Sequence, residues 1–184
     1  SKISSTTGKE INQADPVSDE EVGKLFVGTV YSLPYQKDFG FLFCERLIRP
    51  CFFRKYKSNF GLGQKVSFEL AEAGPQPKAK IKKRYPLEDG KQKTAIIITN
   101  IREDRIDCHT SEGRKLTSSQ YELERLLANW RMMEGQEILA NILEIPKDIV
   151  TGPNTDLAYN IELSKEQDDA FSIRNKIDVE KLYE

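Results

Sequence analysis

The side chains best suited to binding chemistry are three phenylalanines spaced two residues apart. Phe39, Phe41 and Phe43 are separated by Gly40 and Leu42. Because successive side chains of a β-strand point to opposite faces of the sheet, this spacing predicts that all three rings share one face. Rings that are displayed together on a sheet can stack on other flat aromatic groups.

Cationic side chains accompany these rings along the chain. A second strand-like run contributes Phe52 and Arg54, and three lysines flank the two runs, at Lys37, Lys55 and Lys57. Unpaired nucleobases stack on aromatic rings, while lysine and arginine hold the phosphates that join them. The combination predicts a surface that binds single-stranded nucleic acid.

The same rings could instead belong to a hydrophobic core, because alternation places one face of every strand inside. Val30, Val66 and Phe68 are expected to be core residues. For Phe39, Phe41 and Phe52, the surrounding cations favour a surface position, and burial in the core is the alternative.

The strands that would position these residues follow from the hydrophobic pattern and from the turn residues between them. Apolar and polar residues alternate along residues 64–71, and Gly28 indicates a bulge or tight bend in the first strand. Five strands are predicted, at residues 24–33, 39–44, 51–56, 64–71 and 78–83. Short strands with no helix among them predict a mainly β fold, a five-stranded antiparallel barrel of the OB type.

Five motifs in this stretch occur in the order found in the cold-shock domain family. They are Gly28-Thr29-Val30, Lys37-Asp38-Phe39-Gly40-Phe41-Leu42, Phe52-Phe53, Gly63-Gln64-Lys65-Val66-Ser67-Phe68, and Gly74-Pro75 followed by Ala79. Roughly a third of the chain therefore resembles a cold-shock domain. The resemblance implies an OB barrel that binds single-stranded RNA or DNA.

Three phenylalanines of the chain match stacking positions of the family, namely Phe39, Phe41 and Phe52. Nearby tyrosines could add further rings, although no family position assigns them that role. The candidate nucleic-acid-binding residues are Phe39, Phe41, Phe52, Lys37, Arg54, Lys55, Lys57, Tyr31, Tyr35 and Tyr56.

The chain departs from the family at four of these positions or their neighbours. Ser32 stands where the family has its stacking Trp, and Leu33 replaces the neighbouring Phe. Asp38 replaces a Gly and adds a negative charge beside the expected groove. Arg54 replaces a His and can still stack through its guanidinium plane.

The second half of the chain predicts another β-rich domain with one helix. Strands are expected at residues 94–101, 105–110, 114–117, 135–145 and 157–163. Ser118 or Ser119 can cap the helix, with Glu122 in its first turn. Apolar residues at helical spacing are expected to form its packing face: Leu123, Leu126, Leu127, Trp130 and Met133.

A short pattern recurs between the two halves. Gly63-Gln64 and Gly74-Pro75 flank the fourth strand of the first half, and Gly135-Gln136 and Gly152-Pro153 recur in the second. The repeat predicts a second, degenerate OB-like barrel, with the helix between its third and fourth strands. This half has no Phe-Gly-Phe sequence and is acidic, so we expect it to contact a protein partner rather than nucleic acid.

Charge is distributed unevenly, although the formal net charge of the chain is only −1. Residues 24–84 hold 13 Lys and Arg against 4 Asp and Glu, and the remainder holds 15 against 25. Phosphate attraction is local, because salt screens charges beyond about 10 Å. The basic segment therefore suits nucleic acid, despite the balanced total.

No residue pattern indicates catalysis or a cofactor. His109 lies beside Asp107 and Cys108, but a lone histidine without a nucleophile or orienting group is more often structural. The three cysteines lack metal-site spacing and are expected to be reduced, partly buried thiols. No apolar run approaches the ~18 residues of a membrane helix, so a cytoplasmic, membrane-free protein is expected.

These observations predict five segments and one principal function. The segments are a flexible N-terminal arm (1–23), a cold-shock-like barrel (24–84), a linker (85–93), a second β-rich domain (94–165) and a C-terminal tail or docking helix (166–184). The predicted function is non-catalytic binding of single-stranded nucleic acid, with RNA favoured over DNA. A protein-interaction scaffold and an accessory subunit of a nucleic-acid-processing complex are the alternatives.

Overall fold

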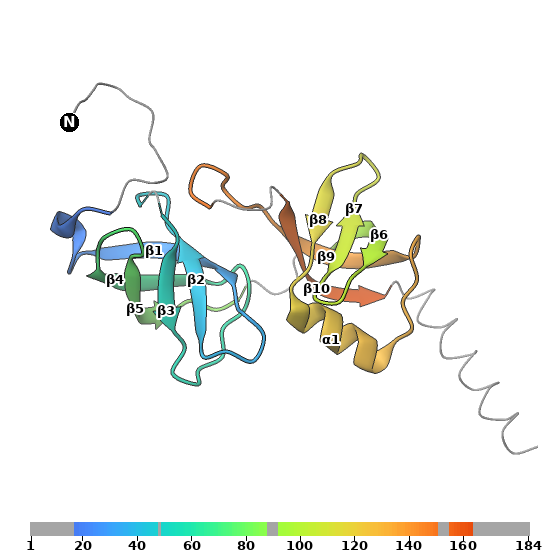
Figure 1. Ribbon diagram of the computed structural model, residues 1–184, viewed down its shortest axis with the longest axis horizontal. Helices are drawn as coiled ribbons and strands as arrows, with labels where there is room; N and C mark the ends of the chain where they lie inside the picture. The colour runs from blue at the N-terminus through green and yellow to red at the C-terminus, as the bar shows by residue number, and fades with distance from the viewer. Residues whose placement is uncertain (1–16, 48, 88–91, 151–154, 164–184) are drawn as a thin grey trace, which may run out of the picture. The chain divides into compact units, whose positions relative to one another are not determined.

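Ten strands and one α-helix form two barrels in the described part of this computed structural model (Figure 1). The structure describes residues 17–47, 49–87, 92–150 and 155–163. Two units hold one barrel each: Ser1–Glu88 with Ile145–Asn154, and Asp89–Glu144 with Thr155–Glu184. The predicted domain boundaries stay predictions, and the expected C-terminal tail or docking helix lies outside the described residues.

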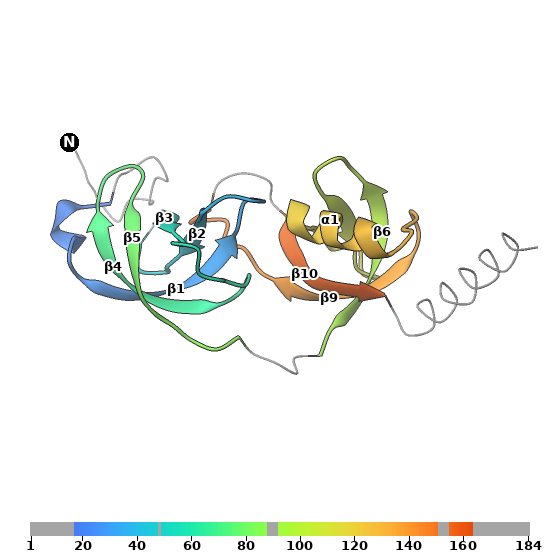
Figure 2. The same ribbon diagram turned by 90° about the horizontal axis from the view of Figure 1, so that it is seen from below.

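The first barrel has the strand order β1-β2-β3-β5-β4 and is closed by pairing of β1 with β4, which run side by side in Figure 2. Four of its pairs are antiparallel, and β3 and β5 are parallel. The strands are β1 (Leu25–Ser32), β2 (Phe39–Phe43), β3 (Cys51–Arg54), β4 (Lys65–Glu72) and β5 (Lys78–Arg84). The predicted five-stranded OB-type barrel is confirmed.

The interior of this barrel is filled by alternate residues from every strand. Seven side chains in it are completely buried: Val30, Leu42, Cys51, Phe53, Val66, Phe68 and Leu70. The predicted inward set of β4 is therefore confirmed. Burial of aliphatic and aromatic side chains of this size, each worth roughly 1.5–3 kcal/mol, is the main source of the barrel's stability.

Gly28 allows close packing and is not the site of the β1 bulge. A Cβ atom at Gly28 would lie 2.8 Å from the Phe43 carbonyl oxygen and 2.9 Å from Leu42 Cδ1. The bulge of β1 is three residues further on, at Tyr31, where the register with β2 shifts between Val30 and Ser32. A glycine inside a strand can signal a bulge, a tight bend or a close approach of this kind, and the sequence alone does not separate them.

The second barrel repeats this topology, with strand order β10-β8-β7-β6-β9. Its third and fifth strands, β8 and β10, are the parallel pair, as β3 and β5 are in the first barrel. Its elements are β6 (Thr94–Ile101), β7 (Ile106–His109), β8 (Lys115–Thr117), α1 (Gln120–Asn129), β9 (Glu137–Leu143) and β10 (Asp156–Leu163). The predicted second barrel, with a helix between its third and fourth strands, is confirmed.

The Gly-Gln repeat is a shared corner of both barrels. Gly63 and Gln64 exchange backbone hydrogen bonds with Val30, since Gly63 N donates to Val30 O (2.8 Å) and Val30 N donates to Gln64 O (2.9 Å). Gly135 and Gln136 make the same two bonds with Ile98, at 2.8 and 2.9 Å. Both glycines have a positive φ, 81° and 87°, which glycine adopts without steric cost.

The glutamine side chains of the two corners also act alike. Gln64 Oε1 accepts from Gly61 N, and Gln136 Oε1 accepts from Met133 N, each at 3.0 Å. The repeated dipeptide therefore reflects one turn geometry built twice. The second Gly-Pro pair of the repeat, Gly152-Pro153, lies outside the described residues.

Helix α1 begins at Ser119, whose hydroxyl accepts from Glu122 N at 3.3 Å, as the sequence predicted. Leu123 and Leu126 are buried in the second core, and Trp130 packs against it. Two members of the predicted packing stripe do not pack: Leu127 is 51% exposed, and Met133, beyond the end of the helix, is 60% exposed. A 10-residue helix on a small barrel presents only a narrow face to the core.

A carboxylate–guanidinium pair, Glu122 and Arg125, holds α1 to β10. Glu122 Oε1 accepts from Ile161 N (2.8 Å), and Arg125 donates to Ile161 O (2.5 Å) and to Glu122 Oε2 (2.7 Å). The register of β10 with β9 shifts between Tyr159 and Glu162, and Asn160 there has a φ of 51°. Glu122 and Arg125 therefore hydrogen-bond the N–H and C=O groups of Ile161, which the bulge removes from the pairing of β10 with β9.

Residues ahead of β1 are attached to the first barrel. Val17 is buried and forms a two-bond bridge with Gly74 in the β4–β5 turn, at 2.9 Å in each direction. Asp19–Glu21 form a 3-10 turn, and Gly23 N donates to Leu70 O (2.8 Å). Within the predicted N-terminal arm, residues 17–23 therefore contact the first barrel, while residues 1–16 lie outside the described part.

Candidate nucleic-acid interface

Three phenylalanine rings from β2 and β3 lie together on the outer face of the first barrel. Phe41 is directly opposite Phe52 across the two strands. The ring centroids of Phe39 and Phe52 are 5.4 Å apart and nearly parallel, and Phe41 meets each of them edge-on at 6.0 Å. We call Phe39, Phe41 and Phe52 the aromatic trio; each ring is half-buried and therefore leaves part of its surface to solvent.

Gly40 makes this arrangement possible from the opposite face of β2. A Cβ at Gly40 would lie 2.8 Å from Phe53 Cζ and 2.8 Å from the Ser32 carbonyl oxygen. The strand can therefore approach the core only with glycine at this position. Phe43, the third alternating ring, is covered and contacts Tyr31 (5.9 Å between centroids), so it does not extend the trio.

The four predicted cations surround the end of the aromatic trio where β2 begins and β3 ends. Arg54 is opposite Phe39 in register, and its guanidinium carbon lies 5.9 Å from the Phe52 centroid. Lys55 Nζ donates to the Lys37 carbonyl oxygen (3.5 Å). Lys37, Arg54 and Lys57 are exposed, and Lys55 is partly buried. The structure thus brings the predicted rings and cations together.

Asp38 holds the turn that follows β3. Its backbone carbonyl accepts from Lys55 N and its Oδ1 accepts from Lys57 N, both at 2.9 Å. Tyr56 and Lys57 adopt the left-handed conformation, with φ of 50° and 63°, which non-glycine residues rarely take. The carboxylate therefore fixes a turn that leaves Tyr56 76% exposed beside the trio.

The other two candidate tyrosines do not join the aromatic trio. Tyr31 is the bulge residue of β1, and its partner is Phe43. Burial, with a smaller contribution from Cys51, raises the pKa of Tyr31 to about 12, so its hydroxyl stays protonated. Tyr35 lies half-buried in the turn between β1 and β2.

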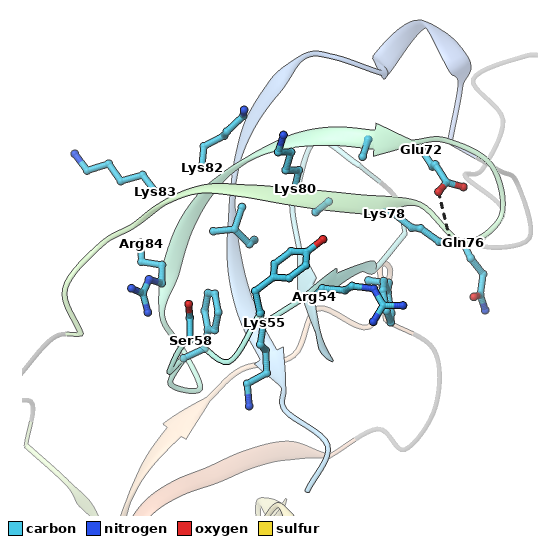
Figure 3. Close-up of a pocket in the computed structure, with 16 residues that line it drawn as sticks. Arg54, Lys55, Ser58, Glu72, Gln76, Lys78, Lys80, Lys82, Lys83 and Arg84 are labelled. Carbon is cyan, nitrogen blue, oxygen red and sulfur yellow. Dashed lines mark ion pairs between the residues drawn. The ribbon is translucent and has the colours of Figure 1, made fainter. Parts of the chain in front are cut away.

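A groove of about 840 Å³ lies along β5, and Phe52 of the trio is among the residues that line it. Figure 3 shows the cations of β5 around this groove. Phe52, Arg54, Lys55 and Tyr56 line it on the side of β3, and β5 contributes cations on the other. The cations along β5 that line it are Lys78, Lys80, Lys82, Lys83 and Arg84. The site prediction did not include these five. Alternation with Ala79 and Ile81 indicated an outward face for three of them, Lys78, Lys80 and Lys82.

No protein-family model and no curated protein matches this chain. Among solved structures, the chain matches drosophila Unr CSD456 at 15% sequence identity and a TM-score of 0.33. The match covers 78% of this chain and 63% of that one. The two five-stranded closed barrels of this chain are themselves the kind of fold that the sequence resemblance implied.

The second barrel has no aromatic trio. Matching the strand registers of the two barrels places Arg105, Asp107 and Thr117 where the first has Phe39, Phe41 and Phe52. Asp107 Oδ1 accepts from Arg105 Nε (3.1 Å) and from Thr117 Oγ1 (3.4 Å), and Asp107 Oδ2 from Arg102. An ionic cluster therefore replaces the rings.

Two guanidinium groups of this cluster share the single carboxylate of Asp107. Partial desolvation acts to raise the pKa of the Asp107 carboxyl, but the hydrogen bonds and charges of Arg102 and Arg105 outweigh it and hold that pKa below its usual value. His109 occupies the position matching Phe43, and its Nδ1 pairs with Thr99 Oγ1 at 2.6 Å. This contact gives His109 a structural role.

Other chemistry is not indicated in the described residues. They contain no group of three side chains that could hold a metal ion, and no helix long and apolar enough to cross a membrane. Cys44, Cys51 and Cys108 are free and buried. Burial raises the pKa of the Cys51 and Cys108 thiols to about 12, which keeps them in the unreactive thiol form.

Proposed function

We propose that this chain binds single-stranded nucleic acid without catalysing a reaction, with RNA favoured over DNA. The observation that carries the proposal is the aromatic trio, three mutually packed rings left partly open on an outer barrel face. Stacking on such rings is worth about 1–3 kcal/mol per base and tolerates different sequences. Arg54, Lys55 and their neighbours would hold the phosphates between the stacked bases.

The aromatic trio is tested by replacing two of its rings. Phe39→Ala with Phe41→Ala should weaken binding at least about thirtyfold, because each lost ring removes roughly 1 kcal/mol or more of stacking. Fluorescence anisotropy with labelled oligo-U, oligo-dT and duplex DNA would measure this and compare RNA with DNA. The duplex should bind worst, because its bases are already stacked on one another.

A matched change elsewhere on the barrel controls for the loss of apolar surface. Leu25 and Val27 are exposed on β1, at 64% and 57%, and lie outside the aromatic trio. Leu25→Ala with Val27→Ala should leave oligonucleotide affinity unchanged. If the phenylalanine pair binds like wild type while its circular dichroism shows a folded barrel, the proposed function is wrong.

A protein-interaction scaffold is the second candidate, favoured by the ionic cluster that replaces the trio in the second barrel. Such a protein would use both barrels to contact polypeptides, either alone or as an accessory subunit of a nucleic-acid-processing complex. The same titrations separate the candidates. A scaffold would bind neither oligo-U nor oligo-dT, even at low salt, where electrostatic contacts to phosphates are strongest.

A further inference from the structure

The groove along β5 exists because β3 and β5 separate soon after they pair. The two strands are joined only at Phe52 with Lys78 and at Phe53 with Ala79. β3 ends at Arg54, whereas β5 continues to Arg84. The space between them has a partly apolar floor of Phe60, Ala79 and Ile81 and holds about 840 Å³.

A bulge turns the cations of β5 outward. Lys78 and Lys80 alternate with the inward Ala79 and Ile81, as a regular strand requires. The register with β4 then shifts between Ile81 and Lys83. This irregularity leaves three successive cations exposed: Lys82, Lys83 and Arg84. The groove is therefore cationic along its whole β5 wall (Figure 3).

Most of this charge is not neutralised within the first barrel. Glu72 is the single carboxylate among the residues that line the groove, and it pairs with Lys78 at 3.3 Å. Lys82 pairs with Glu69 (3.5 Å). Lys83 and Arg84 contact the neutral rings of Tyr85 and Phe60. Lys80 forms no ion pair with any residue that the structure describes.

The groove and the aromatic trio are continuous. Phe52 belongs to both, and Arg54, which lies over the Phe52 ring, lines the groove. A strand whose bases stack on the trio would therefore pass directly into the β5 groove. Along this wall, Lys80, Lys83 and Arg84 form no ion pair with any described residue. Their charges suit the phosphates of such a strand, and the open, partly apolar floor suits its sugars.

We propose that the β5 groove holds the sugar–phosphate backbone of the strand that leaves the aromatic trio. The inference rests on the proposed function and extends it, because it assigns a second contact region outside the trio. Short oligonucleotides would occupy the trio alone, and longer ones would occupy the trio and the groove. The groove would then set the length of strand that binds.

The test is a pair of lysines that can be neutralised without breaking an ion pair within the described residues. In Lys80→Gln with Lys83→Gln, affinity for an oligo-U of about 4 nucleotides should match wild type, whereas affinity for one of about 16 nucleotides should fall. For the longer strand, the log–log salt slope should be shallower by about 1.4, at about 0.7 per lost phosphate contact. Between about 50 and 200 mM salt, wild type should then lose about sevenfold more affinity than the variant.

A second pair controls for net charge alone. Lys24→Gln with Lys115→Gln removes the same charge from exposed lysines outside the groove. It also removes the exposed ion pair of Lys24 with Glu21 (3.5 Å), a kind of pair that contributes little to stability. This double variant should bind both lengths as wild type does. Equal behaviour of the two variants on the longer strand would overturn the groove assignment while leaving the trio intact, whereas failure of wild type to bind either length would overturn the proposed function itself.

An acidic polypeptide is the other polyanion that could enter the groove. Polyglutamate of matched charge is the probe for it. If Lys80→Gln with Lys83→Gln weakens polyglutamate binding but leaves binding of the longer oligo-U unchanged, the groove serves a protein and the proposal is wrong. Loss of oligo-U affinity in this variant, with the short strand unaffected, is the result that supports it.

Discussion

At the scale of single residues, Asp38 has two opposing effects on the proposed interface. Its charge repels phosphate, while its Oδ1 holds Lys57 N at 2.9 Å and so fixes the turn that carries Tyr56. The cold-shock family has a glycine, without a side chain, at the position of Asp38. Comparison with the family therefore indicates the added charge but not the hydrogen bond. The hydrogen bond is visible only once the end of β3 has been placed against the start of β2.

Two substitutions separate the effects of Asp38. Asp38→Asn keeps an acceptor for Lys57 N and removes the charge, so oligo-U affinity should equal or exceed that of wild type. Asp38→Ala removes both, and should cost about 0.5–1.5 kcal/mol of stability in urea unfolding. Its affinity should be lower than that of Asp38→Asn. Identical affinities of the two variants would mean that the turn does not contribute to binding.

Several residue-level assignments could be made from the sequence, and others could not. Period-two spacing placed Phe39 and Phe41 on the outer face, and the cross-strand run placed Phe52 near them. The same spacing gave no reason to separate Phe43 from them, since its burial depends on the bulge that brings Tyr31 over it. The β5 cations were visible in sequence, but a groove forms there only because β3 stops at Arg54.

At the scale of elements, helix α1 depends on a buried pair of charges. Glu122 is 3% exposed, and together with Arg125 it bonds both backbone groups of Ile161. The sequence correctly predicted the start of the helix from its serine cap. It could not predict this contact, because the bulge at Asn160 that frees Ile161 comes 31 or more residues after the helix ends.

Removing the carboxylate of this pair should destabilise the second barrel. Glu122→Ala leaves Arg125 and the Ile161 N–H without their partner, which should cost about 1–3 kcal/mol. Urea unfolding followed by Trp130 fluorescence reports on this barrel, because Trp130 is the single tryptophan and packs against its core. Glu124→Ala, a partly exposed position on the same helix, is the control and should change stability by less than about 0.5 kcal/mol. If Glu122→Ala and Glu124→Ala lowered stability equally, the contact of Glu122 and Arg125 with Ile161 would not be what stabilises this barrel.

At the scale of the whole molecule, one barrel topology occurs twice with two different outer faces. The shared Gly-Gln corner was recognisable in sequence because its geometry needs glycine at a positive φ and a glutamine oxygen as cap. The outer faces were only partly predictable. Absence of Phe-Gly-Phe excluded a second trio, but the ionic cluster of Arg102, Arg105 and Asp107 depends on strand register.

The ionic cluster gives the second barrel its own response to acid. The folded pKa of Asp107 is depressed, so its contribution to stability is present above the unfolded pKa of about 3.9 and is lost as pH falls through the folded value. Below about pH 4, wild type should therefore lose stability more steeply than Asp107→Asn, which is less stable at neutral pH. Trp130 fluorescence in urea, measured from pH 7 down to about pH 3, would check this.

A neighbouring acid provides the comparison for this titration. Asp104 also pairs with Arg105, at 3.6 Å, but its side chain is 64% exposed. Asp104→Asn should follow the wild-type pH profile, since exposed ion pairs contribute little. If the loss of stability with falling pH became shallower in Asp104→Asn but not in Asp107→Asn, the assignment of the acid response to Asp107 would be wrong.

The bridge between Val17 and Gly74 has a practical consequence for the proposed binding surface. The bridge attaches Val17 to the β4–β5 turn, and this turn leads directly into Lys78, the first residue of β5 in the groove wall. A version of the protein trimmed to begin at Lys24 would retain all five strands of the first barrel but would lose the bridge between Val17 and Gly74. Trimming of that kind would alter the entrance to the β5 groove without touching any residue that lines it.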